Sequence, residues 1–476
     1  MMLVRLIIIL FIMLCVPDLG AQSVLKLPNI FASGMVLQQK DTVTIWGWGN
    51  PGANVKISNS WHKRIYKTKV DENGCWKVDI LTPSASYNSQ NLKISSQHET
   101  LLLNNILIGD VWIVGGQSNM QMNFKGNPDQ PTENAQKILL RCNHNNIRLF
   151  RVENGYSLNV CDTINGKWSI ATPENVKEFS VIGYVFGEKI HNIEKIPIGL
   201  IQSAHGGSVA EAWIDKETLE KFGEFDLNLG KKKIDPIWYS FEPTVLYNKM
   251  LAPMLPLSVK GVIWYQGESN VERPEQYRRL FPLLVRSWRK YFNKTDLPFY
   301  YVQIAPYNHA NVNSAEFREV QLDLMDSISN VGMVVTLDVG EPDVIHPARK
   351  EIIGERLAYW ALNCVYGHKA FECRGPEYRS MEVKDGHAFI KFNYASNGLS
   401  FMGKEPKGFE VAGEDRIFSP AKVRITPAFW GNEGLEIWND SIKNPVAVRY
   451  GYTNYVDGTL FNTDGLPASS FRTDKW

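Results

Sequence analysis

The 476-residue chain is nearly neutral, with 51 Lys and Arg against 50 Asp and Glu, and 44% of its residues are hydrophobic. A chain of this length and apolar content buries a large core and typically divides into two or three domains. The net charge of +1 excludes the strongly basic composition that is typical of nucleic-acid-binding proteins. The sequence therefore predicts a globular protein of several domains without a nucleic-acid partner.

The first 21 residues have the layout of a secretory signal peptide. One arginine precedes an apolar run from Leu6 to Leu14, and the segment ends on the small residues Gly20 and Ala21. The apolar run is shorter than the roughly 20 residues that a membrane-spanning helix needs, which disfavours the alternative of a membrane anchor. We expect residues 1–21 to be a signal peptide and the mature protein to be exported to the periplasm or the medium.

Residues 22–107 follow the pattern of short β-strands. Apolar and polar residues alternate in residues 43–46, 54–57 and 76–80, and turn residues such as those at 50–52 separate these segments. Alternation with a period of two residues, interrupted by turns, is typical of a small antiparallel β-sandwich. We interpret this region as an accessory domain.

The next segment runs from a buried strand into a tight turn that carries a serine. Residues 110–114 are mostly apolar, and Gly115-Gly116 then permits a sharp turn before Ser118. A hydroxyl at the carboxyl end of a buried strand is where a hydrolase places its nucleophile. Gln117 and Asn119 flank the serine, and we expect their side chains to hold the turn by hydrogen bonds to the backbone.

Strand-like and helix-like segments alternate between residues 108 and 366. This alternation predicts an α/β domain with a parallel sheet. The predicted strands are at 198–203, 261–266, 299–304 and 331–338, and the predicted helices at 274–291 and 348–361. Because parallel strands end at one edge of an open sheet, we expect the polar segments that follow them to meet there.

An acid and an imidazole follow the last predicted strand. Asp343 and His346 are three residues apart, and a carboxylate that orients a histidine is what activates a serine as a nucleophile. We expect His346 to act as the general base toward Ser118, and Asp343 to orient it. Asp338 is the alternative acid, although its spacing from the histidine fits less well.

Alternation with a period of two residues returns in the last part of the chain. It occurs in residues 388–392, 408–411, 422–425 and 447–450, which predicts a β-rich segment over residues 367–476. We expect this segment to pack on the preceding domain rather than to fold alone.

The motifs, taken in order, resemble the sialate O-acetylesterase family of carbohydrate esterases, within the SGNH hydrolase superfamily. The matching residues are 35–38, 46–48, 116–120, 206–207, 211–213, 264–270, 343–346, 448–450 and 465–474. They extend over nearly the whole mature chain. The resemblance implies a three-layer SGNH-hydrolase-like domain with a parallel sheet over residues 108–366, flanked by the N-terminal β-sandwich and the C-terminal β-rich segment.

The resemblance also implies where an oxyanion hole lies. The backbone N–H of Ser118 is the first expected donor. The glycine block of the superfamily corresponds to Gly206 and Gly207, either of which is a candidate for the second donor. The chain lacks the usual asparagine of the third block, so the third donor is open, with the side chain of Gln266 preferred over that of Asn270.

Other side chains near the predicted strand ends are candidate substrate contacts. Gln117, Asn119 and the aromatic residues Trp213 and Trp264 belong to this group, because an aromatic ring can stack on a sugar. Glu268 is a further candidate, with orientation of the backbone or of His346 as its more natural role. A carboxylated sugar also favours a nearby cation, for which Arg349 and Arg356 on the predicted helix are candidates.

These features predict a serine esterase that removes O-acetyl groups from sugars through an acetyl-enzyme on Ser118. The resemblance implies O-acetylated sialic acids as the substrate and no metal or organic cofactor. A related alternative is a deacetylase of acetylated xylan or another polysaccharide. An alternative of a different class is a non-catalytic carbohydrate-binding surface protein with a degenerate esterase core.

Overall fold

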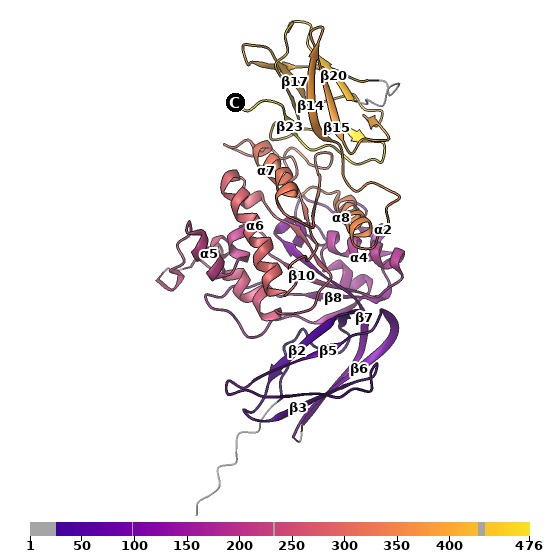
Figure 1. Ribbon diagram of the computed structural model, residues 1–476, viewed down its shortest axis with the longest axis vertical. Coiled ribbons are helices and arrows are strands. Elements are labelled where there is room, and N and C mark those ends of the chain that lie inside the picture. Colours follow the sequence, from indigo (N-terminus) through magenta and orange to yellow (C-terminus); the bar gives the residue numbers. More distant parts are fainter. Residues whose placement is uncertain (1–24, 98, 232–233, 427–433) are drawn as a thin grey trace, which may run out of the picture.

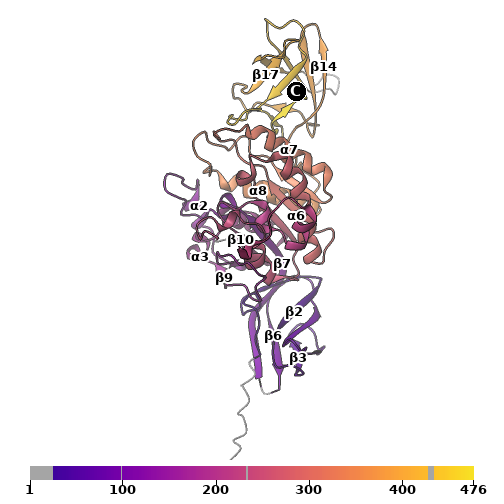
Figure 2. The ribbon, with the colours of Figure 1, turned by 90° about the vertical axis from the view of Figure 1, so that its left-hand side faces the viewer.

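The computed structural model describes residues 25–97, 99–231, 234–426 and 434–476. The predicted signal peptide at residues 1–21 lies outside these ranges. A β-rich region lies at each end of the elongated molecule, and the helices gather between them (Figures 1 and 2). Within the described ranges, no helix is both long enough and apolar enough to cross a lipid bilayer.

A sheet of parallel strands forms the centre of the molecule. Its strands, in spatial order, are β13 (Val331–Val334), β12 (Phe299–Val302), β11 (Gly261–Tyr265), β7 (Glu99–Gly116), β10 (Ile198–Ala204), β8 (His144–Arg151) and β9 (Trp168–Ala171). All neighbouring pairs are parallel except β8 and β9. Together with the helices, this sheet confirms the predicted α/β class.

Two pairs of long helices pack against this sheet. They are α4 (Val181–Glu194) with α8 (Lys350–Cys364), and α6 (Pro274–Tyr291) with α7 (Ser314–Ser327). In β7, Trp112 and Val114 join the hydrophobic cluster that contains α4 and α8, whereas Val111 and Ile113 join the cluster that contains α6 and α7. Successive side chains of a strand point to opposite faces. A strand that is covered on both sides must therefore be apolar throughout, as residues 111–114 are.

Shorter elements complete this part of the chain. The helices are α1 (Ser118–Gln121), α2 (Ala135–Leu139), α3 (Pro173–Lys177) and α5 (Lys216–Phe222), and a 3₁₀ turn, η6, spans Glu268–Asn270. Helix α4 begins where the Ser180 hydroxyl accepts a hydrogen bond from the Gly183 N–H, an arrangement that satisfies one of the free donors of the first turn.

Strand β7 joins the N-terminal β-rich region to the central sheet. Its first half pairs with β6 (Ser86–Ser96) and its second half with β10 and β11. The remaining strands of the region are β1 (Val36–Gln38), β2 (Thr42–Trp48), β3 (Asn54–Asn59), β4 (Tyr66–Lys69) and β5 (Cys75–Leu81). The predicted boundary between residues 107 and 108 thus falls inside a continuous strand.

The C-terminal region contains two four-stranded sheets, with the strand orders β14-β15-β20-β19 and β18-β17-β21-β23. Its strands are β14 (Glu377–Lys384), β15 (His387–Asn393), β16 (Leu399–Ser400), β17 (Phe409–Ala412), β18 (Phe418–Pro420), β19 (Lys422–Ile425), β20 (Gly434–Trp438), β21 (Ala447–Tyr450), β22 (Phe461–Asn462) and β23 (Phe471–Arg472). Buried Arg318 of α7 donates hydrogen bonds to the Ser470 hydroxyl and the Gly451 carbonyl. The region is therefore packed on the helical part of the molecule.

Candidate active site

Ser118 stands at the carboxyl end of the central strand β7. Gly116, the last residue of that strand, has a φ of +133°, and a Cβ there would lie 2.1 Å from the Tyr265 carbonyl oxygen. Only glycine permits this backbone conformation and this close approach. The chain can therefore turn sharply between β7 and α1, which leaves the Ser118 hydroxyl at the edge of the sheet.

His346 meets Ser118 at this edge from a loop that precedes α8. The Nε2 atom of His346 lies 2.7 Å from the Ser118 Oγ, across 228 residues of sequence. Burial and the positive charge of Lys350 lower the pKa of His346 from 6.5 to about 4. The imidazole is therefore neutral at neutral pH and able to accept a proton from the serine.

The second ring nitrogen of His346 contacts Gln130. Its Nδ1 lies 2.5 Å from the Gln130 side-chain oxygen. An amide oxygen only accepts hydrogen bonds, so Nδ1 carries the hydrogen and Nε2 is left as the acceptor for Ser118. The neutral Gln130 thus selects the tautomer that a general base requires.

This contact corrects the expectation that Asp343 would orient His346. The structure places Asp343 on the exposed surface of the loop, where water solvates the carboxylate without a desolvation cost. The alternative acid, Asp338, instead accepts two hydrogen bonds from Arg356, at 2.8 and 2.7 Å. Neither carboxylate forms a hydrogen bond with His346 in the described part of the chain.

Gly206 lies close to the serine, and Gly207 lies farther away. A Cβ on Gly206 would be 3.6 Å from the Ser118 Cβ, whereas the nearest atom to one on Gly207 would be the Ser240 hydroxyl oxygen, at 3.8 Å. The Gly206 N–H donates to the Gln121 side-chain oxygen at 2.9 Å. Of the two glycines, Gly206 is therefore the one that adjoins the nucleophile.

Gln266 and Asn270 use their amide groups inside the core. The Gln266 Nε2 donates to the Ser208 carbonyl and to the Asn270 side-chain oxygen, at 3.1 and 2.6 Å, and the Asn270 Nδ2 donates to Glu211. Buried amides require such internal partners. This corrects the expectation that one of them faces the oxyanion, because their donors point to neighbouring residues instead of Ser118.

The predicted aromatic substrate contacts are also corrected. Trp213 and Trp264 are both 0% exposed and pack edge to face with ring centroids 5.9 Å apart. Completely buried indoles cannot stack on a sugar. Trp264 is buried because its strand, β11, is covered on both faces.

Gln117 and Asn119 are buried, Glu268 is half-buried, and the three side chains connect the segments that form the site. The Gln117 side-chain oxygen accepts a hydrogen bond from the Gly267 N–H at 3.0 Å. The Asn119 Nδ2 donates to the Glu268 carboxylate at 2.5 Å and to the Ile345 carbonyl at 3.1 Å. Through these hydrogen bonds the three side chains hold the segments of the site together, and none of them lines the cavity beside Ser118.

A polar cavity of about 200 Å³ opens beside Ser118. Side chains that can form hydrogen bonds with sugar hydroxyls dominate its lining, which consists of Ser118, Gln121, Met122, Asn123, Asn127, Arg151, Val152, Asn154, Glu178 and Gln202. Arg349 and Arg356 are absent from this lining. Arg151 was not among the predicted site residues, although it ends strand β8 at the same sheet edge. Gln130 was not among them either, and no local pattern marks it.

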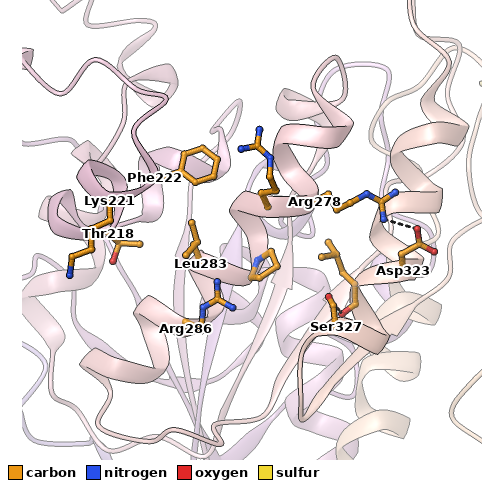
Figure 3. Close-up of a pocket in the computed structure, with 11 residues that line it drawn as sticks. Thr218, Lys221, Phe222, Arg278, Leu283, Arg286, Asp323 and Ser327 are labelled. Atoms are coloured by element: carbon orange, nitrogen blue, oxygen red, sulfur yellow. Dashed lines mark hydrogen bonds and ion pairs between the residues drawn. The ribbon is translucent and has the colours of Figure 1, made fainter.

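A larger cavity, of about 600 Å³, lies elsewhere, among α5, α6 and α7 (Figure 3). Its lining includes Phe222, Arg278 and Arg286, and none of its residues belongs to the serine site. The described ranges contain no cluster of three or more His, Cys, Asp or Glu side chains able to hold a metal ion.

A neutral histidine in contact with a serine at the edge of a parallel sheet is typical of an ester hydrolase, and comparison with known proteins agrees. A family model described as a carbohydrate esterase, sialic acid-specific acetylesterase, matches residues 108–363. The chain is a carboxylic ester hydrolase. It belongs to this family of sialic acid-specific acetylesterases.

Individual relatives match over nearly the full length of the chain. A sialate O-acetylesterase of Mus musculus is 27% identical, with 92% of each chain covered, and that of Homo sapiens is 26% identical, with 95% of this chain and 93% of the relative covered. A solved carbohydrate acetylesterase from Xanthomonas citri is 32% identical, has a TM-score of 0.85, and covers 95% of this chain and 100% of its own. The similarity thus includes both β-rich regions.

Proposed function

We propose that this protein is an exported serine esterase that removes O-acetyl groups from sugars, with O-acetylated sialic acids as the preferred substrate. The observation that carries the proposal is the 2.7 Å contact between the Ser118 Oγ and the His346 Nε2. The family and the names of the curated relatives support acetylated sugars as the substrate class.

The reaction proceeds through an acetyl-enzyme. The Ser118 Oγ attacks the acetyl carbonyl while the His346 Nε2 takes the hydroxyl proton, and the sugar then departs as an alcohol that receives this proton. A water molecule then gives a proton to His346 and attacks the acetyl carbon. The bond from this carbon to the Ser118 Oγ breaks, the oxygen takes the proton back from His346, and acetate leaves. The Ser118 N–H opens helix α1, where it has no acceptor within the helix, so it stabilises the oxyanion. Gly206 lies beside that position.

The esterase domain has three layers in this proposal, with α4 and α8 on one face of the sheet and α6 and α7 on the other. The N-terminal β-rich region is a sandwich, and residues 108–366 form the catalytic unit. The layering is supported by strand β7, in which Val111 and Ile113 belong to one hydrophobic cluster and Trp112 and Val114 to the other.

The orientation of His346 gives a first prediction. We expect Gln130→Leu to lower kcat for p-nitrophenyl acetate by about tenfold, because loss of the accepting oxygen frees the imidazole to adopt the other tautomer. Asp343→Asn keeps the shape of an exposed side chain, so we expect kcat to stay within about threefold. Steady-state kinetics of both variants test whether Gln130→Leu loses more kcat than Asp343→Asn. A larger loss in Asp343→Asn would show that the carboxylate replaces Gln130 during turnover.

Arg151 supports a carboxylated sugar as the substrate. Its side chain is 55% exposed at the cavity, with one hydrogen bond, at 3.0 Å, to the Glu178 carbonyl. The Glu178 carboxylate lies 2.8 Å from Lys125 but 4.0 Å from Arg151. Because Lys125 is the nearer cation to this carboxylate, the Arg151 guanidinium retains donors for a substrate carboxylate.

The substrate class gives a second prediction. Acetate release by the native protein should be faster from bovine submaxillary mucin than from acetylated xylan. Arg151→Met should raise KM for a free O-acetylated sialic acid by about tenfold, because a charge-assisted hydrogen bond is lost, and leave KM for its neutral methyl ester within about twofold. Arg286→Met, a loss of an exposed cation from the distant cavity, is the control. Faster release from xylan would assign the protein to polysaccharide deacetylation.

The non-catalytic alternative has its own test. A fluorophosphonate reacts covalently only with an activated serine. A protein with a degenerate core would remain unlabelled, whereas the proposed esterase is labelled at Ser118.

A further inference from the structure

Lys350 is a buried cation directly behind the candidate active site. It is the first residue of α8, four residues after His346, and it is 0% exposed. Burial of an ammonium group carries a large desolvation cost unless polar partners surround it. The mechanism proposed above assigns this side chain no step, so its position requires a separate explanation.

The Lys350 Nζ donates a hydrogen bond to the Asn119 side-chain oxygen. This contact fixes the orientation of the Asn119 amide, because a flipped amide would present its NH₂ group to the ammonium. The Asn119 Nδ2 is thereby directed at the Glu268 carboxylate, 2.5 Å away, and at the Ile345 carbonyl, 3.1 Å away. The Asn119 side chain thus uses its oxygen and its NH₂ group to connect its own turn with the segments that contain Glu268 and Ile345 to Lys350.

The connected segments are those that carry the reacting groups. Asn119 directly follows Ser118, and Ile345 directly precedes His346. Glu268 belongs to the turn η6 after strand β11; the residue is half-buried, and its carboxylate oxygen Oε2 has no exposed surface. The two backbone segments beside the serine and the imidazole therefore share a single polar anchor.

We propose that Lys350, Asn119 and Glu268 form a buried positioning unit that keeps the Ser118 turn and the His346 loop at reacting distance. This inference rests on the proposed function of Ser118 and His346. Lys350 is a positioning residue that acts through Asn119 and does not touch the substrate. A displacement of about 1 Å between reacting groups suffices to reduce turnover by one to two orders of magnitude.

The charge of Lys350 provides a second effect that can be measured. The groups that face it are Glu268, Glu341 and His346, with the Tyr265 ring 6.0 Å from its Nζ. Burial lowers the pKa of Lys350 to about 7, although the two carboxylates act in the opposite direction. The Lys350 ammonium in turn lowers the pKa of His346. Removal of the ammonium must therefore raise the pKa of His346, and the loss of activity on acidification must begin at a higher pH.

The test is Lys350→Met, which retains the length of the side chain and removes its charge. We expect kcat for p-nitrophenyl acetate to fall by about tenfold or more, with KM within about twofold of the native value. We also expect the acidic limb of kcat/KM to move to higher pH. A lysine whose charge does not act on His346 would leave that limb in place, and a lysine that does not position the reacting groups would leave kcat unchanged.

Lys189→Met is the matched control. Lys189, in α4, forms an ion pair at 2.7 Å with Glu355 of α8, the helix that also contains Lys350, but this ion pair lies outside the site. Both kcat and the acidic limb should remain native in this control. Native values of both in Lys350→Met would overturn the proposal, as would a loss of kcat that only follows the folded fraction measured by circular dichroism.

Asn119→Ala decides the question if Lys350→Met does not fold. A tenfold lower kcat with unchanged KM supports the positioning unit, and a native kcat overturns it. Ser118→Ala separates this inference from the proposed function. Turnover that persists without the serine contradicts the mechanism itself, whereas an inactive Ser118→Ala beside a native Lys350→Met contradicts only the positioning unit.

Discussion

Replacement of Ser118 by alanine will lower kcat for p-nitrophenyl acetate by roughly 10³-fold or more, because no acetyl-enzyme can form without the nucleophilic oxygen. The midpoint of thermal unfolding should hardly change. The Ser118 hydroxyl is half-buried and makes one hydrogen bond, to His346, and such a bond contributes about 1 kcal/mol to the free energy of unfolding.

The measurement combines acetate release, fluorophosphonate labelling and thermal denaturation. Ser169→Ala is a suitable control, since Ser169 is also half-buried and donates one hydrogen bond, to the Leu149 carbonyl, outside the site. The native protein and the control should be labelled, and Ser118→Ala should not. Turnover of Ser118→Ala at the native rate would contradict the serine mechanism and direct attention to another nucleophile.

Replacement of His346 by alanine will have an effect of similar size. Without the imidazole, the serine keeps its proton at neutral pH and remains a weak nucleophile, so we expect kcat to fall by roughly 10³-fold. His368→Ala is the control, because the side chain of His368 contacts Glu194 away from the site. A loss in the control equal to that in His346→Ala would indicate damage to the fold.

The pH dependence of the native protein reports on the same histidine. A general base must be neutral, so activity is present above the pKa of His346 and is lost as the pH falls through it. Because burial and the charge of Lys350 lower this pKa to about 4, kcat/KM should remain high well into the acidic range and decline near pH 4. A decline near 6.5, the ordinary pKa of histidine, would contradict the described environment of the imidazole.

The sequence by itself determined strands β7, β10, β11, β12 and β13 of the central sheet, but not β8 and β9, and it determined the position of the serine at the end of β7. The apolar run at 111–114 marks a strand covered on both faces, and Gly116 marks a turn that no other residue permits. Such signals are local, because backbone conformation and the alternation of side chains depend on neighbouring residues. The rule that parallel strands end at one edge then brought Ser118 and His346 to the same region.

Only the tertiary structure decided which side chains surround this pair. Gln130 reaches His346 across 216 residues of sequence, and Lys350 reaches Asn119 across 231. Asp343, close to the histidine in sequence, instead lies in solvent, and Trp264 is in the core. Hydrogen-bond partners and burial depend on how distant segments pack, and packing is a property of the whole fold that no local pattern contains.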